Sequence, residues 1–400
     1  MKVLQINSVC GVGSTGRIAT DLYKVMKENG IESKVAFGIG TAENIPQEDA
    51  FKFGNKFDYY VHNAVSRITG KAGFYSKINT IKLLEFIKQY KPDLIHIHNI
   101  HGYYINVKML FEFLKKYDKP VIWTLHDCWA FTGHCAYFDL VNCTKWKTEC
   151  YNCPIHIEYP KSFTDNSRHM YKLKKQLFTG VENLTIVTPS QWLADLAKQS
   201  FLKEYPVKVI NNGIDLSTFK PIINNDIKAK YNCENKYLIL GVAFGWGKRK
   251  GMDAFIELSN RLDENKYKIM LVGTDENIDK NMPDNIISIH RTQNANELTK
   301  IYSAADLFVN PTREENYPTV NMESLACGTP VLTFNTGGSP EIIDETCGRV
   351  VEKDDIDSMY NEIINICENN VFSKEMCLKK SRMFDKNEKY RNYIELYKKQ

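Results

Sequence analysis

Two glutamates, Glu315 and Glu323, stand eight residues apart in the segment Glu314-Glu-Asn-Tyr-Pro-Thr-Val-Asn-Met-Glu-Ser-Leu-Ala-Cys-Gly-Thr-Pro-Val331. If Glu315 lies in a loop and Glu323 in the helix that follows, both carboxylates can face one ligand. The start of that helix also presents backbone N–H groups that favour a phosphate. The segment therefore predicts that both carboxylates face one ligand, with phosphate or other negative charge favoured at the helix start. The alternative is a pair of solvated surface carboxylates.

A basic turn, Gly247-Lys-Arg-Lys-Gly251, follows an apolar strand and precedes a helical pattern. The place of Lys250 and Arg249 after a strand and before a helix favours a functional role for this turn, in which a fixed cation would bind an anion. The alternative is an exposed basic turn that binds nothing.

A glycine-rich turn, Gly11-Val-Gly-Ser-Thr-Gly16, follows the first strand. No Gly-Lys-Ser/Thr follows it, so it is not a P-loop. No acidic ribose-binding residue stands at the end of the next strand, so a dinucleotide site is not indicated either. We expect the N–H groups around Gly13 and Ser14 to approach a bound ligand. The alternative is a tight turn between strand and helix.

Histidines gather at two expected strand ends. His126, followed by Asp127, ends one strand and is predicted to line a binding site. His96, His98 and His101 surround another strand end. A His-x-His pair can bind a metal, but no third and fourth ligand is evident, so we interpret these three as core and cleft-lining residues.

Cysteines are concentrated in one part of the chain, between Cys128 and Cys153. Four of them, Cys135, Cys143, Cys150 and Cys153, have the spacing C-x7-C-x6-C-x2-C. A C-x2-C pair is the common half of a structural zinc site, and four thiolates would complete a tetrahedral shell. The first half lacks its own C-x2-C, so free thiols and disulfides remain alternatives. We expect this insertion, residues 128–160, to lie on the acceptor side of a binding site.

These residues need a frame of strands and helices to bring them together. Short apolar strands alternate with helical patterns, which is typical of parallel α/β sheets. The expected strands span residues 2–8, 33–39, 94–98, 120–125 and 183–188, and then 237–243, 268–272, 306–309 and 330–333. We predict two doubly wound, Rossmann-like domains that face a central cleft: residues 1–203 with a returning C-terminal helix at 386–400, and residues 207–385.

Composition restricts the function further. The chain has 400 residues, 43% of them hydrophobic, with 52 basic and 48 acidic side chains and a net charge of +4. That balance is too mild for a nucleic-acid-binding protein. No stretch approaches the length of a membrane span, and the N-terminal apolar run is too short for a signal peptide. We therefore expect a cytoplasmic protein with reduced cysteines.

The glutamate segment resembles the E-x7-E signature of retaining GT-B glycosyltransferases. Other landmarks are similar to the family in the same order: Leu125-His-Asp127, Val187-Thr-Pro-Ser-Gln-Trp192, Val209-Ile-Asn-Asn-Gly-Ile-Asp215 and Thr336-Gly-Gly-Ser-Pro-Glu341. Gly-Ser-Thr-Gly-Arg near the start and His-Asp-Cys-Trp-x-Phe-Thr-Gly-x-Cys further on resemble bacterial enzymes of capsular, colanic-acid or O-antigen polysaccharide assembly.

The resemblance implies a role for each matching residue. Glu315 would contact the hydroxyls of the donor sugar, and Glu323 would accept hydrogen bonds from the ribose diol. Lys250 would hold the diphosphate, and His126 would hydrogen-bond the donor sugar. Further donor-binding positions are predicted at Arg249, Gly13, Ser14, Asn316, Tyr317, Pro318 and Thr319. In the family the leaving phosphate is thought to take the acceptor proton, so no general base is implied.

One position departs from the family pattern. The family usually has an arginine five residues before the lysine, and here position 245 is Gly. Either Arg249 or Lys248 substitutes for it, or fewer cations hold the phosphate.

The resemblance implies a hexosyl- or N-acetylhexosaminyl-transferase that uses a nucleotide sugar, with UDP favoured, and needs no cofactor for catalysis. The acceptor would be a glycan or a polyprenyl-diphosphate-linked glycan, used at the inner face of the plasma membrane. The stretch Lys161–Gln176 carries basic and apolar side chains that could contact the membrane; the alternative is a solvated helix face. Rival functions are an inactive sugar-nucleotide-binding scaffold, an epimerase and a phosphorylase.

Overall fold

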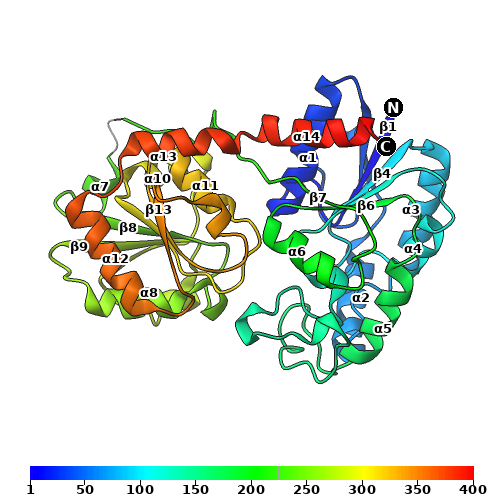
Figure 1. Cartoon of the computed structure of the whole chain (residues 1–400), viewed down its shortest axis with the longest axis horizontal. Helices are drawn as coiled ribbons and strands as arrows, with labels where there is room; N and C mark the ends of the chain where they lie inside the picture. The colour runs from blue at the N-terminus through cyan, green and yellow to red at the C-terminus, as the bar shows by residue number, and fades with distance from the viewer. Residues whose placement is uncertain (224–225) are drawn as a thin grey trace. The chain divides into compact units, whose positions relative to one another are not determined.

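The computed structural model describes residues 1–223 and 226–400. These residues form two compact units, each with its own sheet and its own helices (Figure 1). The first unit comprises Met1–Asn211 together with Tyr390–Gln400, and the second comprises Asn212–Lys389.

The sheet of the first unit has seven parallel strands in the order β3-β2-β1-β4-β5-β6-β7. The strands are β1 (Lys2–Asn7), β2 (Glu32–Phe37), β3 (Ala50–Lys52), β4 (Leu94–Ile97), β5 (Val121–Thr124), β6 (Leu184–Thr188) and β7 (Val207–Val209). Leu4 and Ile6 of β1 face one layer of helices and Val3 faces the other, as the period of two along a strand requires. Both faces of this sheet are therefore covered.

The helices of the first unit form two layers. They are α1 (Gly13–Glu28), α2 (Lys56–Thr69), α3 (Lys77–Tyr90), α4 (Val107–Leu114), α5 (Ser167–Phe178), α6 (Gln191–Gln199) and α14 (Lys386–Lys398). Buried residues of α3 to α6 pack on one face of the sheet, and those of α1 and α14 pack on the other. The predicted return of the C-terminal helix to the first domain is confirmed.

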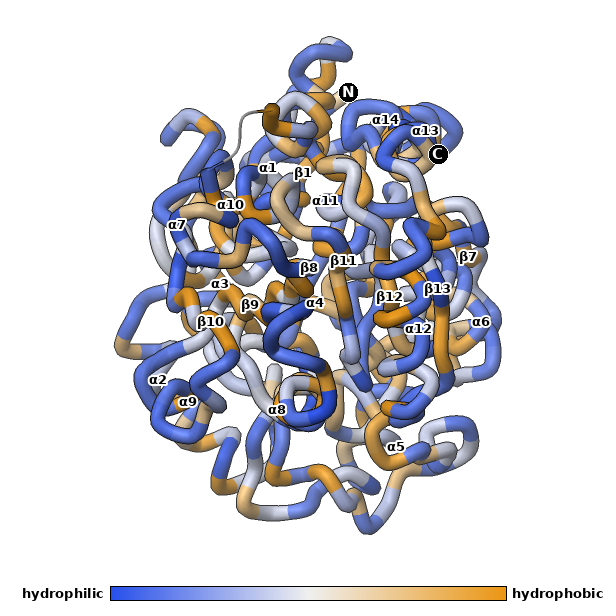
Figure 2. The backbone as a smooth tube through the Cα atoms, turned by 90° about the vertical axis from the view of Figure 1, so that its left-hand side faces the viewer, coloured by the Kyte–Doolittle hydropathy of each residue, from blue (hydrophilic) through white to orange (hydrophobic). Residues whose placement is uncertain are grey.

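The sheet of the second unit has six parallel strands in the order β10-β9-β8-β11-β12-β13. They are β8 (Tyr237–Val242), β9 (Tyr267–Val272), β10 (Ile286–Ile289), β11 (Leu307–Asn310), β12 (Val331–Phe334) and β13 (Gly348–Val351). Figure 2 shows β11 and β12 as orange, hydrophobic stretches of the chain, which suits strands buried on both faces.

The helices of the second unit also cover both faces of their sheet. They are α7 (Ile227–Lys230), α8 (Met252–Arg261), α9 (Glu276–Asp279), α10 (Ala295–Ala304), α11 (Thr319–Ala326), α12 (Ile356–Asn369) and α13 (Lys374–Ser381). Buried residues of α10, α11 and α13 pack on one face, and those of α8 and α12 on the other. Single-turn 3₁₀ helices lie at η1 (Gln47–Asp49), η2 (Trp129–Phe131), η3 (Asp139–Val141), η4 (Lys145–Lys147), η5 (Lys248–Lys250), η6 (Pro340–Ile342) and η7 (Arg382–Phe384).

The boundary between the units differs from the prediction. Residues 207–209, expected at the start of the second domain, form β7, which pairs with β6 at the edge of the first sheet. The division follows at Asn211, because the ladder hydrogen bonds tie β7 to the first unit. At the other end, Lys386–Lys389 belong to the second unit, where Lys386 pairs with Asp215.

Both sheets are doubly wound, as the sequence predicted. In each of them the strand order reverses once, between β1 and β4 in the first sheet and between β8 and β11 in the second. Ligands of such sheets bind at these reversal points, beyond the carboxyl ends of the strands. The reversal points therefore mark two places to examine for a site.

Candidate functional site

At the reversal point of the second sheet, the structure brings Lys250 and Glu315 together. Lys250 lies in η5, in the loop after β8, and Glu315 lies in the loop between β11 and α11. The Lys250 Nζ donates to Glu315 Oε2 at 2.5 Å. Both side chains are about four-fifths buried, at 18% and 19% exposure, so the pair is partly shielded from water.

The residues around Glu315 determine whether its side chain is ionised. Burial raises the pKa of Glu315, but the Lys250 ammonium, the backbone N–H of Asn316 and the Arg249 guanidinium together hold the pKa below its ordinary value. Glu315 is therefore a carboxylate at neutral pH. A carboxylate beside a lysine offers an acceptor for hydroxyls next to a donor for an anion.

Arg313, which the sequence analysis missed, holds the two loops in register. Its side chain is 6% exposed and forms two hydrogen bonds to the Asp253 carboxylate at 2.7 and 3.0 Å. It also donates to the Lys248 carbonyl and to Asp354, both at 2.5 Å. Because Arg313 precedes Glu314-Glu315 in the chain, these contacts position Lys250 against Glu315. Its partners are 41 to 65 residues away in sequence, so spacing alone does not reveal them.

The predicted substitutes for the missing family arginine are both exposed in η5. The Arg249 Nη1 lies 3.5 Å from the Glu314 carbonyl, and the Arg249 carbonyl accepts a hydrogen bond from the Arg313 N–H at 2.9 Å. Lys248 contributes its carbonyl to Arg313. Arg249 thus lies on the Glu315 side of the turn, and its contact with a diphosphate stays a prediction. Gly245 has φ +82°, a left-handed conformation that other residues rarely adopt.

Glu323 lies one turn inside α11, whose first residue is Thr319. Its Oε2 accepts a hydrogen bond from the buried Tyr302 hydroxyl at 3.1 Å. Tyr302, on α10, is a second residue that the sequence analysis missed, because it precedes Glu323 by 21 residues. The expected split, with Glu315 in a loop and Glu323 in a helix, is what the structure has.

The loop between the two glutamates is packed tightly. Asn316, Tyr317 and Pro318 are buried and Thr319 is half-buried. The Gly338 N–H donates to the Asn316 carbonyl at 2.8 Å, and a Cβ on Gly337 would lie 1.7 Å from the Glu315 carbonyl oxygen. Only glycine fits there, so the loop after β12 supports the backbone of Glu315. The three buried residues hold the backbone of this loop in place, and donor binding by them and by Thr319 stays a prediction.

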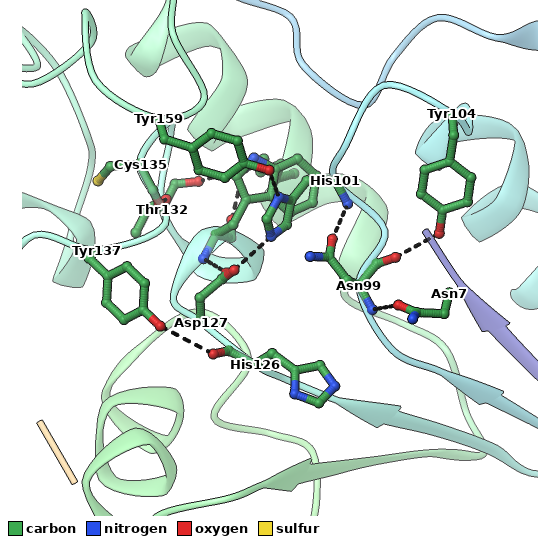
Figure 3. A network of polar contacts seen from close by, with 12 residues as sticks. Asn7, Asn99, His101, Tyr104, His126, Asp127, Thr132, Cys135, Tyr137 and Tyr159 are labelled. Atoms are coloured by element: carbon green, nitrogen blue, oxygen red, sulfur yellow. Dashed lines mark hydrogen bonds and ion pairs between the residues drawn. The ribbon is translucent and has the colours of Figure 1, made fainter. Parts of the chain in front are cut away.

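The reversal point of the first sheet has a different chemistry, built on neutral side chains. The glycine-rich turn closes on itself through the Gly11 N–H and the Gly16 carbonyl, at 3.1 Å. Gly13 begins α1 with φ +65°, and Ser14 is exposed. Nearby, Asn7 accepts a hydrogen bond from the Asn99 N–H at 3.2 Å, which links the ends of β1 and β4 (Figure 3).

A relay of hydrogen bonds sets the role of His126. The Gln5 amide N–H₂ donates to the Ala19 carbonyl, which leaves the Gln5 Oε1 to accept from His98 Nε2 at 3.0 Å. The His98 Nδ1 is then an acceptor, and it lies 3.3 Å from His126 Nε2. This network assigns the proton of His126 to Nε2 and makes its Nδ1 an acceptor. Burial lowers the pKa of His126 to about 4, so the ring is neutral at pH 7.

Asp127 and His101 form a second pair beside His126. The His101 Nε2 lies 2.7 Å from Asp127 Oδ2, and the His101 Nδ1 lies 3.0 Å from the Tyr159 hydroxyl (Figure 3). Burial raises the pKa of Asp127, but His101 and the Trp129 N–H hold it below its ordinary value. Tyr159, from the cysteine-rich insertion, therefore joins the polar network at the end of β5.

The third histidine of the group belongs to the core, as predicted. His96 is fully buried, and its ring nitrogens lie 2.7 Å from the Tyr397 hydroxyl of α14 and 2.7 Å from the Thr124 hydroxyl. His98, by contrast, supports His126 through the relay. None of the three forms part of a metal-binding group in the described residues.

The four predicted zinc ligands line one small cavity of about 20 Å³. The Cys135 and Cys153 thiols are hydrogen-bonded to each other, and the Gly133 N–H donates to the Cys150 sulfur at 3.2 Å. In the part of the chain that the structure describes, however, no three cysteine, histidine or acidic side chains are arranged to hold a metal ion. The thiols are free. A structural zinc ion stays a prediction, which metal analysis of anaerobically purified protein would test.

The segment expected to contact a membrane, Lys161–Gln176, is partly exposed and partly buried. In α5, Met170, Tyr171 and Leu177 are buried in the core, and so is Lys174. The Lys174 ammonium donates to the Trp129 and Thr132 carbonyls at 2.8 and 3.1 Å. On α5 the exposed side is therefore basic, with Arg168, Lys172 and Lys175, while most of its apolar residues are buried; contact of the stretch 161–176 with a membrane stays a prediction. No helix among the described residues has the length and apolar character to cross a bilayer.

Comparison with known proteins agrees with this architecture. Residues 15–218, half of the chain, match the model of Glycosyltransferase Family 4, and residues 235–369 match that of Glycosyl transferases group 1. The chain is 25% identical over 378 residues, 89% of its length and 88% of the relative's, to WcaC of Escherichia coli K12, described as a colanic acid biosynthesis glycosyl transferase.

Two further proteins are similar. One, from E. coli, is named UDP-Gal:alpha-D-GlcNAc-diphosphoundecaprenol alpha-1,3-galactosyltransferase; it is 25% identical over 44% of this chain and 49% of its own. The other is the solved structure of Anabaena Alr3699/HepE in complex with UDP-glucose, with a TM-score of 0.68 and 14% identity over the whole of both chains. With its two doubly wound sheets, the chain belongs to glycosyltransferase family 4 and has the GT-B fold.

Proposed function

We propose that this protein is a retaining glycosyltransferase that moves a hexosyl or N-acetylhexosaminyl group from a UDP-sugar to a lipid-linked glycan during assembly of a bacterial surface polysaccharide. The observation that carries the proposal is the Lys250–Glu315 pair at the reversal point of the second sheet. It puts a cation and a carboxylate 2.5 Å apart at the place where such sheets bind ligands.

Lys250 and Arg249 hold the diphosphate of the donor in this proposal. When the sugar leaves, negative charge grows on the diphosphate, and a partly buried ammonium stabilises that charge more strongly than an exposed one would. The N–H groups at the start of α11 add donors to the same anion. The protein's own groups thus supply the charge that the leaving group needs.

The two glutamates hold the two sugars of the donor. Glu315, ionised at neutral pH, accepts hydrogen bonds from hydroxyls of the transferred sugar. Glu323 accepts from the ribose diol; its Oε2 already accepts from Tyr302, which fixes the direction of the carboxylate. A carboxylate with two oxygens has the capacity for both kinds of contact.

His126 contributes an acceptor and not a charge. Its neutral ring, with the proton on Nε2, offers Nδ1 to a sugar hydroxyl. A group with a pKa of about 4 is a weak base, so it is suited to orienting a hydroxyl more than to removing its proton. In a retaining transfer the departing phosphate oxygen takes the acceptor proton on the same face of the sugar.

The choice of donor and acceptor follows from relatives. Alr3699/HepE was solved with UDP-glucose, and the galactosyltransferase from E. coli is named for a UDP-sugar donor and a diphosphoundecaprenol-linked acceptor. WcaC is described as a colanic acid biosynthesis enzyme. These names support a UDP-sugar and a polyprenyl-diphosphate-linked glycan for this chain.

The test begins with thermal denaturation in the presence of UDP, GDP and their sugars, because a ligand of the folded state raises its stability. We expect UDP to raise the midpoint more than GDP. Release of UDP only when acceptor is present, with an axial linkage retained from the donor in the NMR spectrum of the product, would support the reaction. Full activity of Glu315→Ala, or release of UDP without transfer, would overturn it.

A further inference from the structure

Helix α2 has its apolar face turned towards solvent. Phe57 and Ile68 are 79% and 64% exposed, and Tyr60, Val61 and Ala64 are exposed as well. These positions follow the spacing i, i+3, i+4, i+7 and i+11, which places all five on one side of a helix. In an ordinary surface helix this stripe faces the core, so α2 is inverted.

Buried polar contacts hold α2 in this orientation. On its inner side, the Asp58 carboxylate accepts hydrogen bonds from Ser76 and from the Asn79 side chain. The His62 Nδ1 lies 2.7 Å from the Ser76 hydroxyl, and the His62 Nε2 accepts from the Gly73 N–H at 3.2 Å. Rolling the helix to bury its apolar stripe would break these contacts and leave buried polar groups without partners. The exposure of the stripe is therefore fixed by the fold.

Neighbouring segments extend the apolar surface beyond α2. At the start of α3, Ile78 is 72% exposed, and the Asn79 next to it is bonded to α2. On the other side, Phe163 is 66% exposed, and its N–H donates to the Arg67 carbonyl of α2 at 2.7 Å. We define the outer face as the exposed apolar side chains of these three segments: Phe57, Tyr60, Val61, Ala64, Ile68, Ile78, Ile81 and Phe163.

Basic side chains outnumber acidic ones in the segments that carry this outer face, where the acidic neighbours are Glu85 on α3 and Glu158 beside Arg67 and Lys161. Residues 56–82 carry five of them, Lys56, Arg67, Lys71, Lys77 and Lys82, and Lys161 lies in the loop next to Phe163. The one acidic residue in 56–82 is Asp58, whose carboxylate is turned inward. An apolar stripe flanked by lysine and arginine is the pattern of helices that lie in the surface of an anionic membrane.

We propose that the outer face docks the protein on the surface of an anionic phospholipid bilayer, with α2 lying parallel to the membrane plane. The aromatic and aliphatic side chains enter the region between headgroups and acyl chains, and the basic residues contact lipid phosphates. A second copy of this chain fits less well, because a twofold contact through this face would bring the basic side chains of both copies together.

The surface next to the outer face leads towards the polar network of the first unit. A hollow of about 510 Å³ is lined by residues that include Arg67, Lys161 and Tyr159. The Tyr159 hydroxyl in turn contacts His101, which pairs with Asp127 beside His126. This step rests on the proposed function: an acceptor held in the membrane would then lie near the residues assigned to the reaction.

The proposal is tested by vesicle sedimentation with the full-length protein and no donor or acceptor present. We expect the wild type to bind vesicles made from equal amounts of phosphatidylcholine and phosphatidylglycerol. It should bind vesicles of pure phosphatidylcholine far less. The double variant Phe57→Ser/Ile68→Ser should lower the partition coefficient about tenfold or more, because it removes two apolar anchors. The matched control is Val371→Ser/Met383→Ser, which removes two exposed apolar side chains of the second unit and should bind like the wild type.

Three results would overturn the proposal. The wild type could stay in the supernatant at low salt, or the outer-face variant could bind vesicles like its control. The third result is a dimer in the wild type and the control that the outer-face substitutions convert to a monomer. Circular dichroism and thermal denaturation of both variants exclude misfolding as a cause, since all four side chains are exposed. Transfer to a water-soluble acceptor should be the same in the outer-face variant and the control. Loss of transfer with vesicle binding intact would count against the proposed function alone.

Discussion

The two reversal points differ in charge on the same scaffold: one is built on ionised side chains and the other on neutral ones. At the second sheet, an ammonium and a carboxylate compensate each other, held by the Arg313 guanidinium. At the first sheet, the Gln5–His98–His126 relay keeps the ring that it orients neutral. An anion such as a diphosphate needs charge, whereas sugar hydroxyls need acceptors with a fixed direction. The difference teaches that the same doubly wound scaffold can carry a charged group of side chains at one reversal point and a neutral group at another.

The largest effect is expected from removing the charge at the second site. Lys250→Ala should lower kcat about 10²–10³-fold with a smaller change in KM, because the cation acts on charge that develops only in the transition state. Initial-rate kinetics with saturating acceptor measure this. The matched control is Lys248→Ala, whose side chain lies in the same turn and is exposed. An equal loss in both variants would mean that the turn binds the diphosphate without a distinct role for Lys250.

The next largest effect is expected from the residue that positions this pair. Arg313→Met should lower the free energy of unfolding by about 2 kcal/mol and kcat about tenfold or more, because it frees both loops. Arg313→Lys keeps the charge but loses the planar fork, so it should recover little. Chemical denaturation with the kinetics of both variants provides the measurement. Recovery of full activity by lysine would show that the charge alone matters.

A smaller effect is expected at the neutral site. His126→Ala should lower kcat/KM about tenfold to a hundredfold. Gln5→Leu should lower kcat/KM less, because it removes only the acceptor that sets the tautomers of His98 and His126. Since burial lowers the pKa of His126 to about 4, its titration should leave the rate unchanged between pH 6 and 8. A pH–rate profile of the wild type and His126→Ala checks this. An inflection near pH 6.5 that disappears in the variant would contradict a neutral role.

The smallest effect concerns Lys174 beneath the cysteine-rich insertion. Burial lowers its pKa to about 7, while in the unfolded chain the value is near 10.4. Above pH 7 the unfolded state therefore binds more protons at this site, so stability should rise with pH by at most about 1.4 kcal/mol per pH unit. Denaturation between pH 7 and 8 measures the slope; because the Cys153 thiol, with its pKa lowered to about 7, titrates in the same window, the difference between the wild type and Lys174→Met isolates the lysine. Lys174→Met should lack this contribution, and an unchanged slope in that variant would contradict it.

Predictability from sequence differed between the fold and the site. The alternation of short apolar strands and helices was sufficient to predict two parallel sheets, because few other folds accommodate that pattern. The loop-then-helix placement of Glu315 and Glu323 also followed from local spacing. Arg313, Gln5 and Tyr302 could not be found in this way, since the site residues they contact, Lys248, His98 and Glu323, lie 21 to 93 residues away from them.

The orientation of a helix is a further quantity that sequence leaves open. The amphipathic pattern of α2 shows that one side is apolar, but burial of that side is only the usual outcome. Here Asp58 and His62 have buried partners at Ser76 and Asn79, and these contacts decide which side faces the core. In α5, by contrast, the apolar side faces the core, and its main apolar residues are buried.

Helix α14 has a consequence for how the protein is made. Its Tyr393 and Tyr397 hydroxyls reach Thr124 and His96 in the centre of the first sheet, yet they are translated after the whole of the second unit. A ribosome-bound chain that has just completed Asn211 therefore exposes the apolar surface that α14 will cover. The first unit, synthesised first, is expected to be the last to reach its final form, and only the second can complete folding as one continuous stretch.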